Sequence, residues 1–259
     1  MPAGGGYTAL VLAGSRGPED PVALASGVAE KCLAPLHGKP MLSWVLETLQ
    51  ASASVTGIAV TASRPELVTA LCGASGAKVL RAARSPAQSV LEAAESLDSA
   101  FPLLVVTADN PLLTPARIDA FCTAAANSGA EIAAGLVPSA AIKAAFPESR
   151  RTYLRFRDER YCGANLFALR SESALAGVAF WRKVEQQRKR PWRIVQAFGA
   201  GSLLAFALNR LTLEQAFARA SGTLGVTAAA IPLVEAEAAV DVDRPEDLAL
   251  AERLLRARE

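Results

Sequence analysis

Small residues followed by positive charges mark the first of three segments with residue types suited to chemistry. Residues 12–16 have the sequence Leu-Ala-Gly-Ser-Arg, and Lys31 and Lys39 follow before the next helical pattern. Small residues let backbone N–H groups approach a phosphate chain, and the start of a helix adds positive potential. Arg16 and Lys31 would then neutralise the charge of a triphosphate. A flexible loop with solvated lysines is the alternative.

The other two segments carry aspartates. Asp109 follows the apolar run of residues 103–106, and Asp241 and Asp243 lie close to the C-terminus. Mg²⁺ typically takes one or two carboxylates together with phosphate oxygens. Because alternate residues of an extended chain point the same way, Asp241 and Asp243 could face one site. The alternatives are an Asx turn at Asp109 and an N-cap role for Asp243, with Glu246 three residues later.

Apolar runs and helical periodicity predict the elements that must position these segments. The expected strands are residues 7–12, 55–61, 78–82, 102–107, 130–137, 161–169 and 226–233. The expected helices are residues 40–50, 65–71, 86–97, 115–127, 171–190, 191–208, 213–220 and 245–256. This alternation predicts an α/β, Rossmann-like, mostly parallel sheet with helices on both faces. Ligands of such sheets bind beyond the carboxyl ends of the strands, which directs attention to the loops after Leu12 and Val106.

The second half of the chain is less regular. We expect a single domain, 1–259, with a helical insertion at about 174–222. Five arginines lie near Asn165 and form a basic cluster: Arg150, Arg151, Arg155, Arg157 and Arg160. The basic run 181–193 beside the apolar run 198–208 has three interpretations: a solvated helix face packed on the core, a surface for a lipid-linked or anionic acceptor, or a dimer surface.

Composition excludes several function classes. Lys plus Arg is 27 and Asp plus Glu is 25, and this balance gives no global attraction to nucleic acid or anionic membrane. We expect no signal peptide, and no apolar run is long enough to be a transmembrane segment. The four cysteines are far apart and indicate reduced thiols in a cytoplasmic protein. With His37 as the only histidine, a zinc site and Ser-His-Asp catalysis are disfavoured.

Together the three segments resemble the MobA-like NTP transferase family, the molybdenum cofactor guanylyltransferase-like nucleotidyltransferases. The family's entry motif, roughly LAGG-x-R-x-G…K-x-L-x-x-L-x-GKP, is similar to residues 12–17 and 31–40. Its metal aspartate, in D-x-P-L-L, is similar to residues 109–113, and its closing motif D-[VI]-[DN]-x-P-E-D-L to residues 241–248. Ser15 replaces the second glycine of the entry motif, and the loop that follows is longer than usual.

The resemblance implies a nucleotide-diphospho-sugar transferase (GT-A-like) fold and a Mg²⁺-dependent reaction. A nucleoside monophosphate would move from an NTP, GTP or CTP above all, to a phosphorylated small-molecule or lipid-precursor acceptor, with release of pyrophosphate. It implies catalytic roles for Arg16 and Lys31, acceptor binding by Asn165, and metal binding by Asp109 and Asp243, with Asp241 as the second choice. The implied nucleotide-binding residues are Leu12, Ala13, Gly14, Ser15, Ser85, Gln88 and Ser89.

Two other function classes remain as alternatives. A GT-A-type glycosyltransferase using a nucleotide-sugar would not need the entry loop with Arg16 and Lys31. A non-catalytic nucleotide-binding module would not need to keep these two residues together with both candidate metal ligands. A dinucleotide oxidoreductase is disfavoured because residues 4–6, Gly-Gly-Gly, precede the first strand instead of following it. A homodimer and peripheral membrane contact are further expectations.

Overall fold

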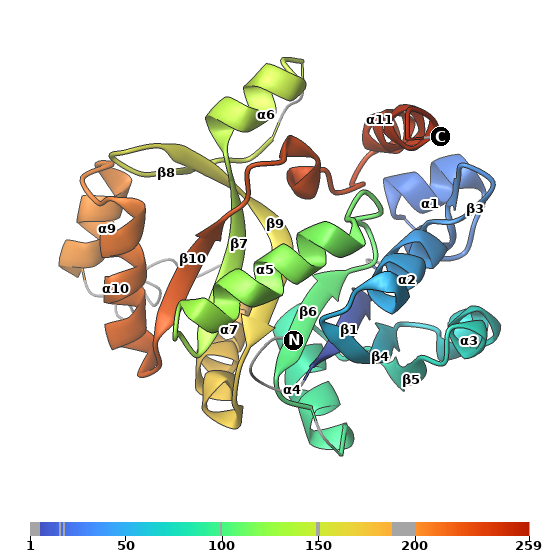
Figure 1. Ribbon diagram of the computed structural model, residues 1–259, viewed down its shortest axis with the longest axis horizontal. Coiled ribbons are helices and arrows are strands. Elements are labelled where there is room, and N and C mark those ends of the chain that lie inside the picture. Colours follow the sequence, from blue (N-terminus) through green and yellow to red (C-terminus); the bar gives the residue numbers. More distant parts are fainter. Residues whose placement is uncertain are drawn as a thin grey trace.

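A mixed eight-stranded sheet runs through the computed structural model, in the order β10-β7-β9-β6-β1-β4-β5, with β8 paired to β9 (Figure 1). The structure describes residues 6–15, 17, 19–98, 100–148, 151–187 and 200–258. The strands are β1 (Tyr7–Ala13), β4 (Val55–Ala62), β5 (Lys78–Arg81), β6 (Leu103–Thr107), β7 (Ile132–Pro138), β8 (Leu154–Arg155), β9 (Arg160–Leu169) and β10 (Ala228–Pro232). Most neighbours are parallel, whereas β9 runs antiparallel to β6, β7 and β8. This mostly parallel sheet confirms the predicted fold class.

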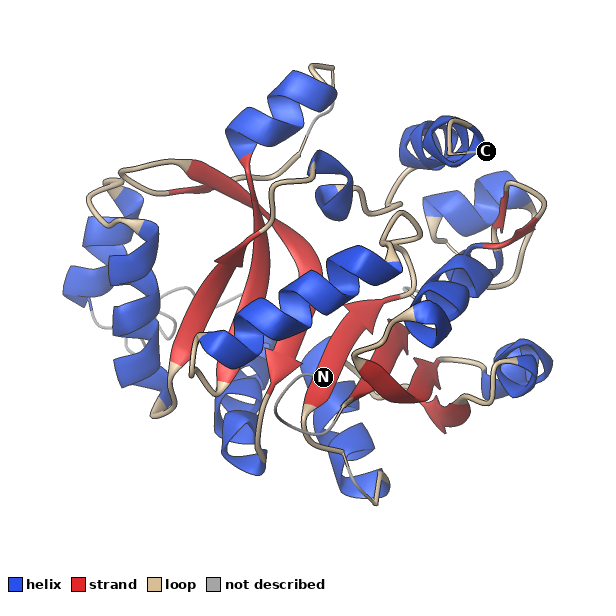
Figure 2. Ribbon diagram, in the orientation of Figure 1, coloured by secondary structure: helices blue, strands red, loops and turns tan. Residues whose placement is uncertain are grey.

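Helices cover both faces of the sheet (Figure 2). They are α1 (Pro21–Ser26), α2 (Met41–Ala51), α3 (Pro65–Ala74), α4 (Pro86–Ser96), α5 (Pro115–Asn127), α6 (Ser139–Ala145), α7 (Leu175–Gln187), α9 (Ala200–Ala207), α10 (Leu213–Leu224) and α11 (Pro245–Arg256). Short 3₁₀ turns are η1 (Lys31–Leu33), η2 (Glu172–Ala174) and η3 (Ala236–Ala239), and β2 (Pro35–Leu36) pairs with β3 (Lys39–Pro40) as a hairpin. Within the described residues, none of the helices is long and apolar enough to cross a membrane.

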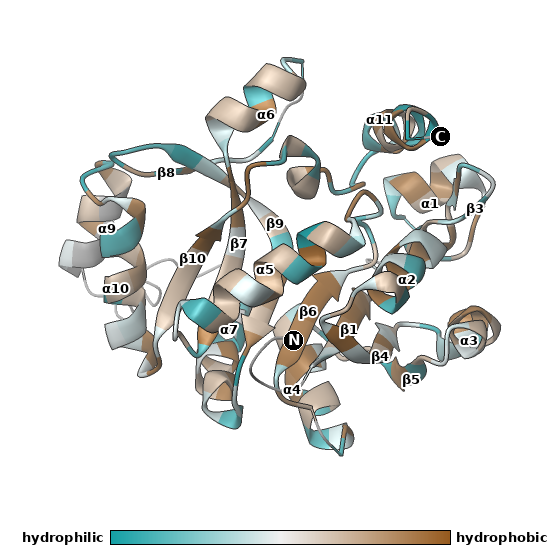
Figure 3. Cartoon of the chain, in the orientation of Figure 1, coloured by the Kyte–Doolittle hydropathy of each residue, from teal (hydrophilic) through white to brown (hydrophobic). Residues whose placement is uncertain are grey.

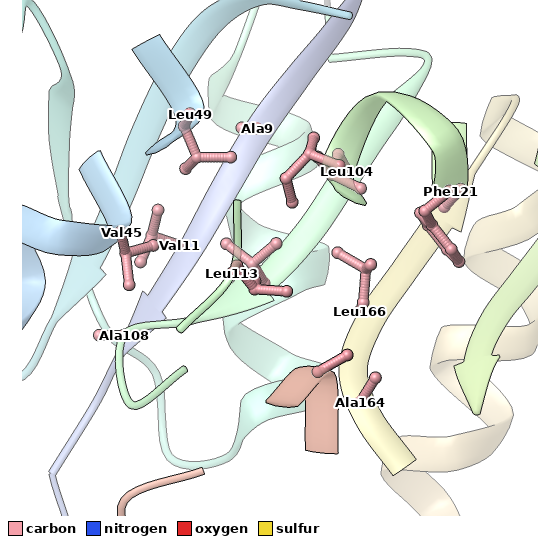
Figure 4. Packing of buried hydrophobic residues seen from close by; sticks show 14 of the residues in the cluster. Ala9, Val11, Val45, Leu49, Leu104, Ala108, Leu113, Phe121, Ala164 and Leu166 are labelled. Atoms are coloured by element: carbon pink, nitrogen blue, oxygen red, sulfur yellow. The ribbon is translucent and has the colours of Figure 1, made fainter. Parts of the chain in front are cut away.

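The central strands are apolar on both sides because both sides are covered. In β1, Ala9 and Val11 pack with α2 and α5, whereas Leu10 between them packs with residues of α4 on the opposite face. Figure 4 shows part of the first cluster, including Phe121 of α5, and Figure 3 shows β1 and β6 in the colour of hydrophobic residues. A strand buried on both faces has a continuous apolar run, which is the pattern that predicted β1.

Several elements differ from the expectations. Helix α1 lies where the sequence indicated only a loop: the carboxylate of Asp20 accepts the N–H groups of Val22 and Ala23, and Gly27 ends the helix in the left-handed region. The hairpin β2–β3 and helix α6 were also missed. All three are too short for periodicity to detect. Of the expected helices 171–190 and 191–208, residues 188–199 lie outside the described residues.

The last helix corrects the expected cap. Asp243 is not the N-cap of α11; that position belongs to Arg244. The side chain three residues after the cap is Asp247 and not Glu246, and its carboxylate accepts the N–H of Arg244 at 3.1 Å. The carboxylate of Asp243 is therefore not used in capping and is available for other partners. The interpretation of residues 174–222 as an insertion in a single domain stays a prediction.

Candidate active site

The carboxyl ends of β1 and β6 form one side of the candidate site. The two strands are parallel, with Leu12 opposite Thr107, and the N–H of Ala108 donates to the carbonyl of Leu12 at 3.0 Å. This register brings the loop after β1 beside Asp109. A hollow of about 20 Å³ lies there, lined by Leu12, Ala13, Gly14, Ser15, Lys31, Cys32, Met41, Ala108 and Asp109. Five expected nucleotide-binding or catalytic positions and one expected metal ligand thus lie together.

Lys31 joins the two aspartates at the centre of the site. Its Nζ donates to Oδ2 of Asp109 at 2.7 Å and to Oδ1 of Asp243 at 2.9 Å. Burial lowers the pKa of Lys31, but the carboxylates of Asp109 and Asp243 raise it by more, so its pKa lies above the ordinary value. Lys31 therefore carries a positive charge throughout the physiological pH range. The segments of residues 31, 109 and 243, far apart in the sequence, meet as the motif order predicted.

The backbone fixes Asp243 beside Asp109. The N–H of Val242 donates to the main-chain carbonyl of Asp109 at 2.8 Å. Val242 itself is fully buried in a cluster with Ala251 and Leu255 of α11. Successive side chains of an extended chain point to opposite sides. Because Val242 points into the core, Asp241 and Asp243 on either side of it point outward. The buried Val242 thus holds the D-V-D segment in place, with the side chains of Asp241 and Asp243 directed away from the core.

The donor set fits a divalent cation that takes most of its ligands from elsewhere. Oδ1 of Asp109 is buried and has no hydrogen-bond partner among the described residues. Such an orphaned carboxylate oxygen is costly unless a cation or donor satisfies it. In the described part of the chain, no group of three or more His, Cys, Asp or Glu side chains could hold a metal. Two carboxylates match Mg²⁺, which usually keeps water and phosphate oxygens in its shell.

Asp241 has different partners from Asp243. Its carboxylate accepts hydrogen bonds from Arg151, the side chain of which is 7% exposed, and from Nδ2 of Asn165 at 3.4 Å. Burial raises the pKa of Asp241 above its ordinary value, although the Arg151 guanidinium acts in the opposite direction. Oδ1 of Asp247 accepts a second hydrogen bond from Arg151 at 2.9 Å. Of the two aspartates in the D-V-D segment, Asp243 is therefore the one that faces Lys31.

A cavity of about 850 Å³ adjoins Asp243. The end of α6 and the segment after it, β9, the D-V-D segment and one side of α11 line it: Ala145, Phe146, Pro147, Glu148, Arg151, Thr152, Cys162, Gly163, Asn165, Asp241, Asp243, Arg244, Glu246, Asp247, Leu250 and Arg253. Asn165 has a positive φ of 50° and lies where the register between β7 and β9 shifts. A bulge of this kind re-aims a side chain. It explains why the amide of Asn165 lies beside Asp241.

Other expected residues lie elsewhere. The hydroxyl of Ser85 caps α4 by accepting the N–H of Gln88, and the buried Ser89 accepts the N–H of Ala83 at 2.9 Å. The side chain of Gln88 contacts Glu92 and Arg182. None of Ser85, Gln88 and Ser89 lines either cavity. These three lie at the start of α4, which follows β5 in the chain and packs on the central strands β1 and β6 and against α7.

The basic residues separate in a similar way. Arg155, Arg157 and Arg160 are exposed and do not line the large cavity, in contrast to Arg151. Arg16 and Arg150 lie outside the described residues, so the catalytic role of Arg16 stays a prediction. The ammonium of Lys39 pairs with Glu47 and lies 3.7 Å from the centre of the Trp44 ring, apart from the Lys31 cluster. All four cysteines are free and buried, and burial raises the pKa of Cys32 to about 12.

Two residues that support the site were not singled out from the sequence. The buried Asn110 donates from Nδ2 to the carbonyls of Ala164 and Ala238, at 2.9 and 3.2 Å. It thus ties the loop of Asp109 to the strand of Asn165 and to η3, which precedes the D-V-D segment. Asp247 is the second, through its bonds to Arg151 and the α11 cap. Both lie inside the quoted motifs, but their roles depend on contacts across the chain.

Comparison with known proteins decides the family. A family model described as the MobA-like NTP transferase domain matches residues 9–191. The chain belongs to this family. A hypothetical transferase from Thermus thermophilus is similar over 94% of this MobA-like chain and 99% of its own, with 35% identity and a TM-score of 0.78. Among curated proteins, none matches the sequence.

More distant structures share the fold of this MobA-like chain. A CMP:2-keto-3-deoxy-manno-octonic acid synthetase, solved with CTP, matches with 17% identity and a TM-score of 0.60, over 99% of this chain and 100% of its own. A 4-diphosphocytidyl-2C-methyl-D-erythritol synthase from Anaerococcus prevotii matches with 9% identity and a TM-score of 0.62, over 97% of this chain and 96% of its own. The family and the fold place the chain among the nucleotidyltransferases.

Proposed function

We propose that the protein is a Mg²⁺-dependent nucleotidyltransferase that moves a nucleoside monophosphate from an NTP to a phosphorylated acceptor. The observation that carries the proposal is the Lys31 cluster, in which one ammonium contacts Asp109 and Asp243 between a small hollow and a large cavity. The small-residue loop beside the hollow can bring backbone N–H groups close to a phosphate chain, and the cavity has room for an acceptor. In this arrangement the NTP binds on the hollow side of the Lys31 cluster and the acceptor binds on the cavity side.

The reaction needs positioning and charge neutralisation more than covalent work by the protein. An oxygen of the acceptor phosphate attacks the α-phosphorus, the bond between the α- and β-phosphates breaks, and pyrophosphate leaves with the electron pair. The permanently charged Lys31, together with Arg16, stabilises negative charge on the triphosphate. Asp109 and Asp243 would hold Mg²⁺. When bound, the cation supplies positive charge that stabilises the phosphate oxygens.

The loop after β1 approaches the phosphates through its backbone. Gly14 has no side chain to exclude a phosphate from the hollow. The N–H of Ser15 donates to Oγ of Ser63 at 2.9 Å, so a phosphate contact at Ser15 requires that this bond be exchanged. Ser85, Gln88 and Ser89 contact the nucleotide and contribute to the choice of its base, and GTP and CTP are the first candidates. Support for these three residues is the resemblance in sequence alone.

Asn165 is proposed to bind the acceptor. Its amide lines the cavity and donates weakly to Asp241, at 3.4 Å, so it can exchange this partner for a polar group of the acceptor. Five acids line the cavity beside three arginines, and two of these, Arg244 and Arg253 of the α11 side, can bind the phosphate of an acceptor. We infer a small phosphorylated molecule or a lipid precursor. The acceptor therefore enters beside Asp243, apart from the β1 loop.

The test is pyrophosphate release with ATP, GTP, CTP and UTP, each with Mg²⁺ and a panel of sugar, polyol and pterin phosphates. Release that requires one NTP, Mg²⁺ and one acceptor class supports the proposal. Lys31→Met removes the charge between the aspartates and is expected to lower kcat/KM by roughly a hundredfold or more. Lys39→Met is the matched control, because Lys39 contacts Glu47 and Trp44 instead, and should keep wild-type turnover.

Two outcomes contradict the proposal. Equal turnover in Lys31→Met and the wild-type protein would exclude the cluster as the reacting centre. Release of a nucleoside diphosphate from a nucleotide-sugar, without pyrophosphate, would favour the glycosyltransferase alternative. Binding of an NTP without turnover by any acceptor class would favour a nucleotide-binding module.

A further inference from the structure

The cation site contains two carboxylates although a third lies nearby. Asp241 is separated from Asp243 by one residue, and both side chains line the large cavity. Yet Lys31 contacts Asp109 and Asp243, whereas the carboxylate of Asp241 accepts from Arg151 and Asn165. This division explains why no three acidic side chains of the described residues form a metal-binding group. Something must therefore hold Asp241 away from the other two.

Arg151 is the strongest partner of Asp241. It comes from the segment before β8, and its side chain is 7% exposed. Nη1 donates to the carboxylate of Asp241 and also, at 3.1 Å, to its main-chain carbonyl. Nη2 donates to Oδ1 of Asp247 at 2.9 Å. The planar guanidinium holds its N–H groups in a rigid fork when it bridges two acids, whereas the donors of an ammonium rotate on a flexible stem.

Asp247 extends this hold to Asp243. Its Oδ2 accepts the N–H groups of Asp243, at 3.3 Å, and of Arg244, at 3.1 Å. Arg151 thus fixes the side chain of Asp241 directly and the backbone of Asp243 through Asp247. Arg151 and Asp247 therefore hold both aspartates, but the carboxylate of Asp241 faces Arg151, whereas that of Asp243 faces Lys31.

We propose that Arg151 is a positioning residue that withholds Asp241 from the cation site and so keeps that site at two carboxylates. The inference rests on the proposed function, which assigns the cation to Asp109 and Asp243. Because the number of charged ligands sets the affinity for hard divalent cations, two carboxylates bind a free cation weakly. The protein then gains its cation together with the triphosphate, and does not retain it between turnovers.

The test measures binding of Mn²⁺ alone to the full chain, with free Mn²⁺ followed by electron paramagnetic resonance. Arg151→Met frees Asp241 to join Asp109 and Asp243, so we expect Mn²⁺ to bind roughly tenfold more tightly than to the wild-type protein. Asp241→Asn alone is expected to leave the affinity unchanged. The double variant R151M/D241N should return to the wild-type affinity, because the third carboxylate is gone.

Three further variants separate Asp241 from simple charge effects and from misfolding. R151M/E148Q has the same net charge as R151M/D241N and changes an exposed acid that also lines the cavity, but it leaves Asp241 free. It should therefore bind Mn²⁺ as tightly as Arg151→Met. Arg155→Met removes an exposed arginine nearby and should not change binding. If Arg151→Met does not fold, Arg151→Lys keeps the charge without the bridge and should tighten binding part of the way.

Wild-type affinity in a folded Arg151→Met variant would overturn the proposal. The proposal would also be overturned if R151M/D241N and R151M/E148Q both bound Mn²⁺ more weakly than Arg151→Met and to the same extent, because only the net charge would then matter. An unchanged Mn²⁺ affinity in Asp243→Asn would contradict the metal assignment of the proposed function instead. The two failures are therefore distinguishable.

Discussion

The loop after β1 and the start of α11 both adjoin the Lys31 cluster, but different forces hold them. We call residues 12–15 the β1 wall, and Arg151, Asn165 and residues 241–247 the α11 wall. Parallel strand register places the β1 wall, which encloses about 20 Å³ with the cluster. Charged side chains that contact one another place the α11 wall, which borders about 850 Å³. Little space is therefore left beside the β1 wall, whereas the α11 wall borders a cavity large enough for a small molecule.

The largest expected effect comes from Asp109, which lines the small hollow beside the β1 wall and contacts Lys31 together with Asp243 of the α11 wall. Asp109→Asn removes a carboxylate charge beside Lys31 and is expected to lower kcat by about a thousandfold, because the charge on the phosphates is no longer organised. Steady-state turnover measures it. Asp98→Asn, an exposed acid in a loop, is the control and should be unaffected. If the turnover of Asp109→Asn stays within a factor of a few of the wild-type value, the reaction does not take place at the site between the two walls.

The second prediction changes the β1 wall alone. Among the described residues, a Cβ at Gly14 would meet only the Cβ of Ala82, at an ordinary 3.7 Å, so we expect the fold to accept Gly14→Val. The added side chain fills the small hollow, and NTP affinity is expected to fall by roughly tenfold or more, with the melting temperature unchanged. Isothermal titration measures the affinity. Retained NTP binding would place the phosphates elsewhere.

The third prediction changes the α11 wall alone. Asn165→Ala removes the amide that faces the large cavity and is expected to raise KM for the acceptor about tenfold, the value of one polar contact. The affinity for NTP should stay constant. Asn209→Ala, another asparagine with positive φ but outside the cavity lining, controls for backbone effects. If Asn165→Ala instead weakens NTP binding, the division of substrates between the walls is incorrect.

The smallest effect is expected away from both walls, at Asp119 of α5. Slight burial raises its pKa, but hydrogen bonds from Ser52 and Ser54 lower it by more, so the folded pKa lies below the ordinary value. A depressed carboxyl pKa stabilises the fold above the unfolded pKa, and this contribution is lost as pH falls through the folded pKa. Asp119→Asn should cost about 1 kcal/mol near neutral pH, a low value because the carboxylate is only partly buried.

Urea unfolding at neutral and acidic pH measures this difference. It should shrink as the pH falls, while kcat at neutral pH stays at the wild-type value in folded protein. A difference that does not depend on pH would show that the carboxylate charge is not involved.

The two walls also differ in how far the sequence predicts them. The β1 wall follows from local patterns, because an apolar run, a small-residue loop and a following aspartate each have a meaning within a few residues. The assignment of Asp243 to the metal came from its motif and stays a prediction, whereas contacts across the chain place its side chain beside Lys31. The roles of Arg151, Asn110 and Asp247 could not be predicted, because the side chain of each has partners 54 to 128 residues away in the sequence. Helix α1 was missed because a six-residue helix has no measurable period.

The most direct test of the central claim is thermal stabilisation by each of the four NTPs, with and without Mg²⁺, in the wild-type protein and in Asp109→Asn. A ligand at a hundred times its Kd adds about 2.7 kcal/mol to the folded state, which is a clear shift of the melting temperature. We expect one NTP to stabilise the wild-type protein strongly, only with Mg²⁺, and the Mg²⁺-dependent part to vanish in Asp109→Asn. No shift with any NTP, or an equal shift in both proteins, would contradict the account.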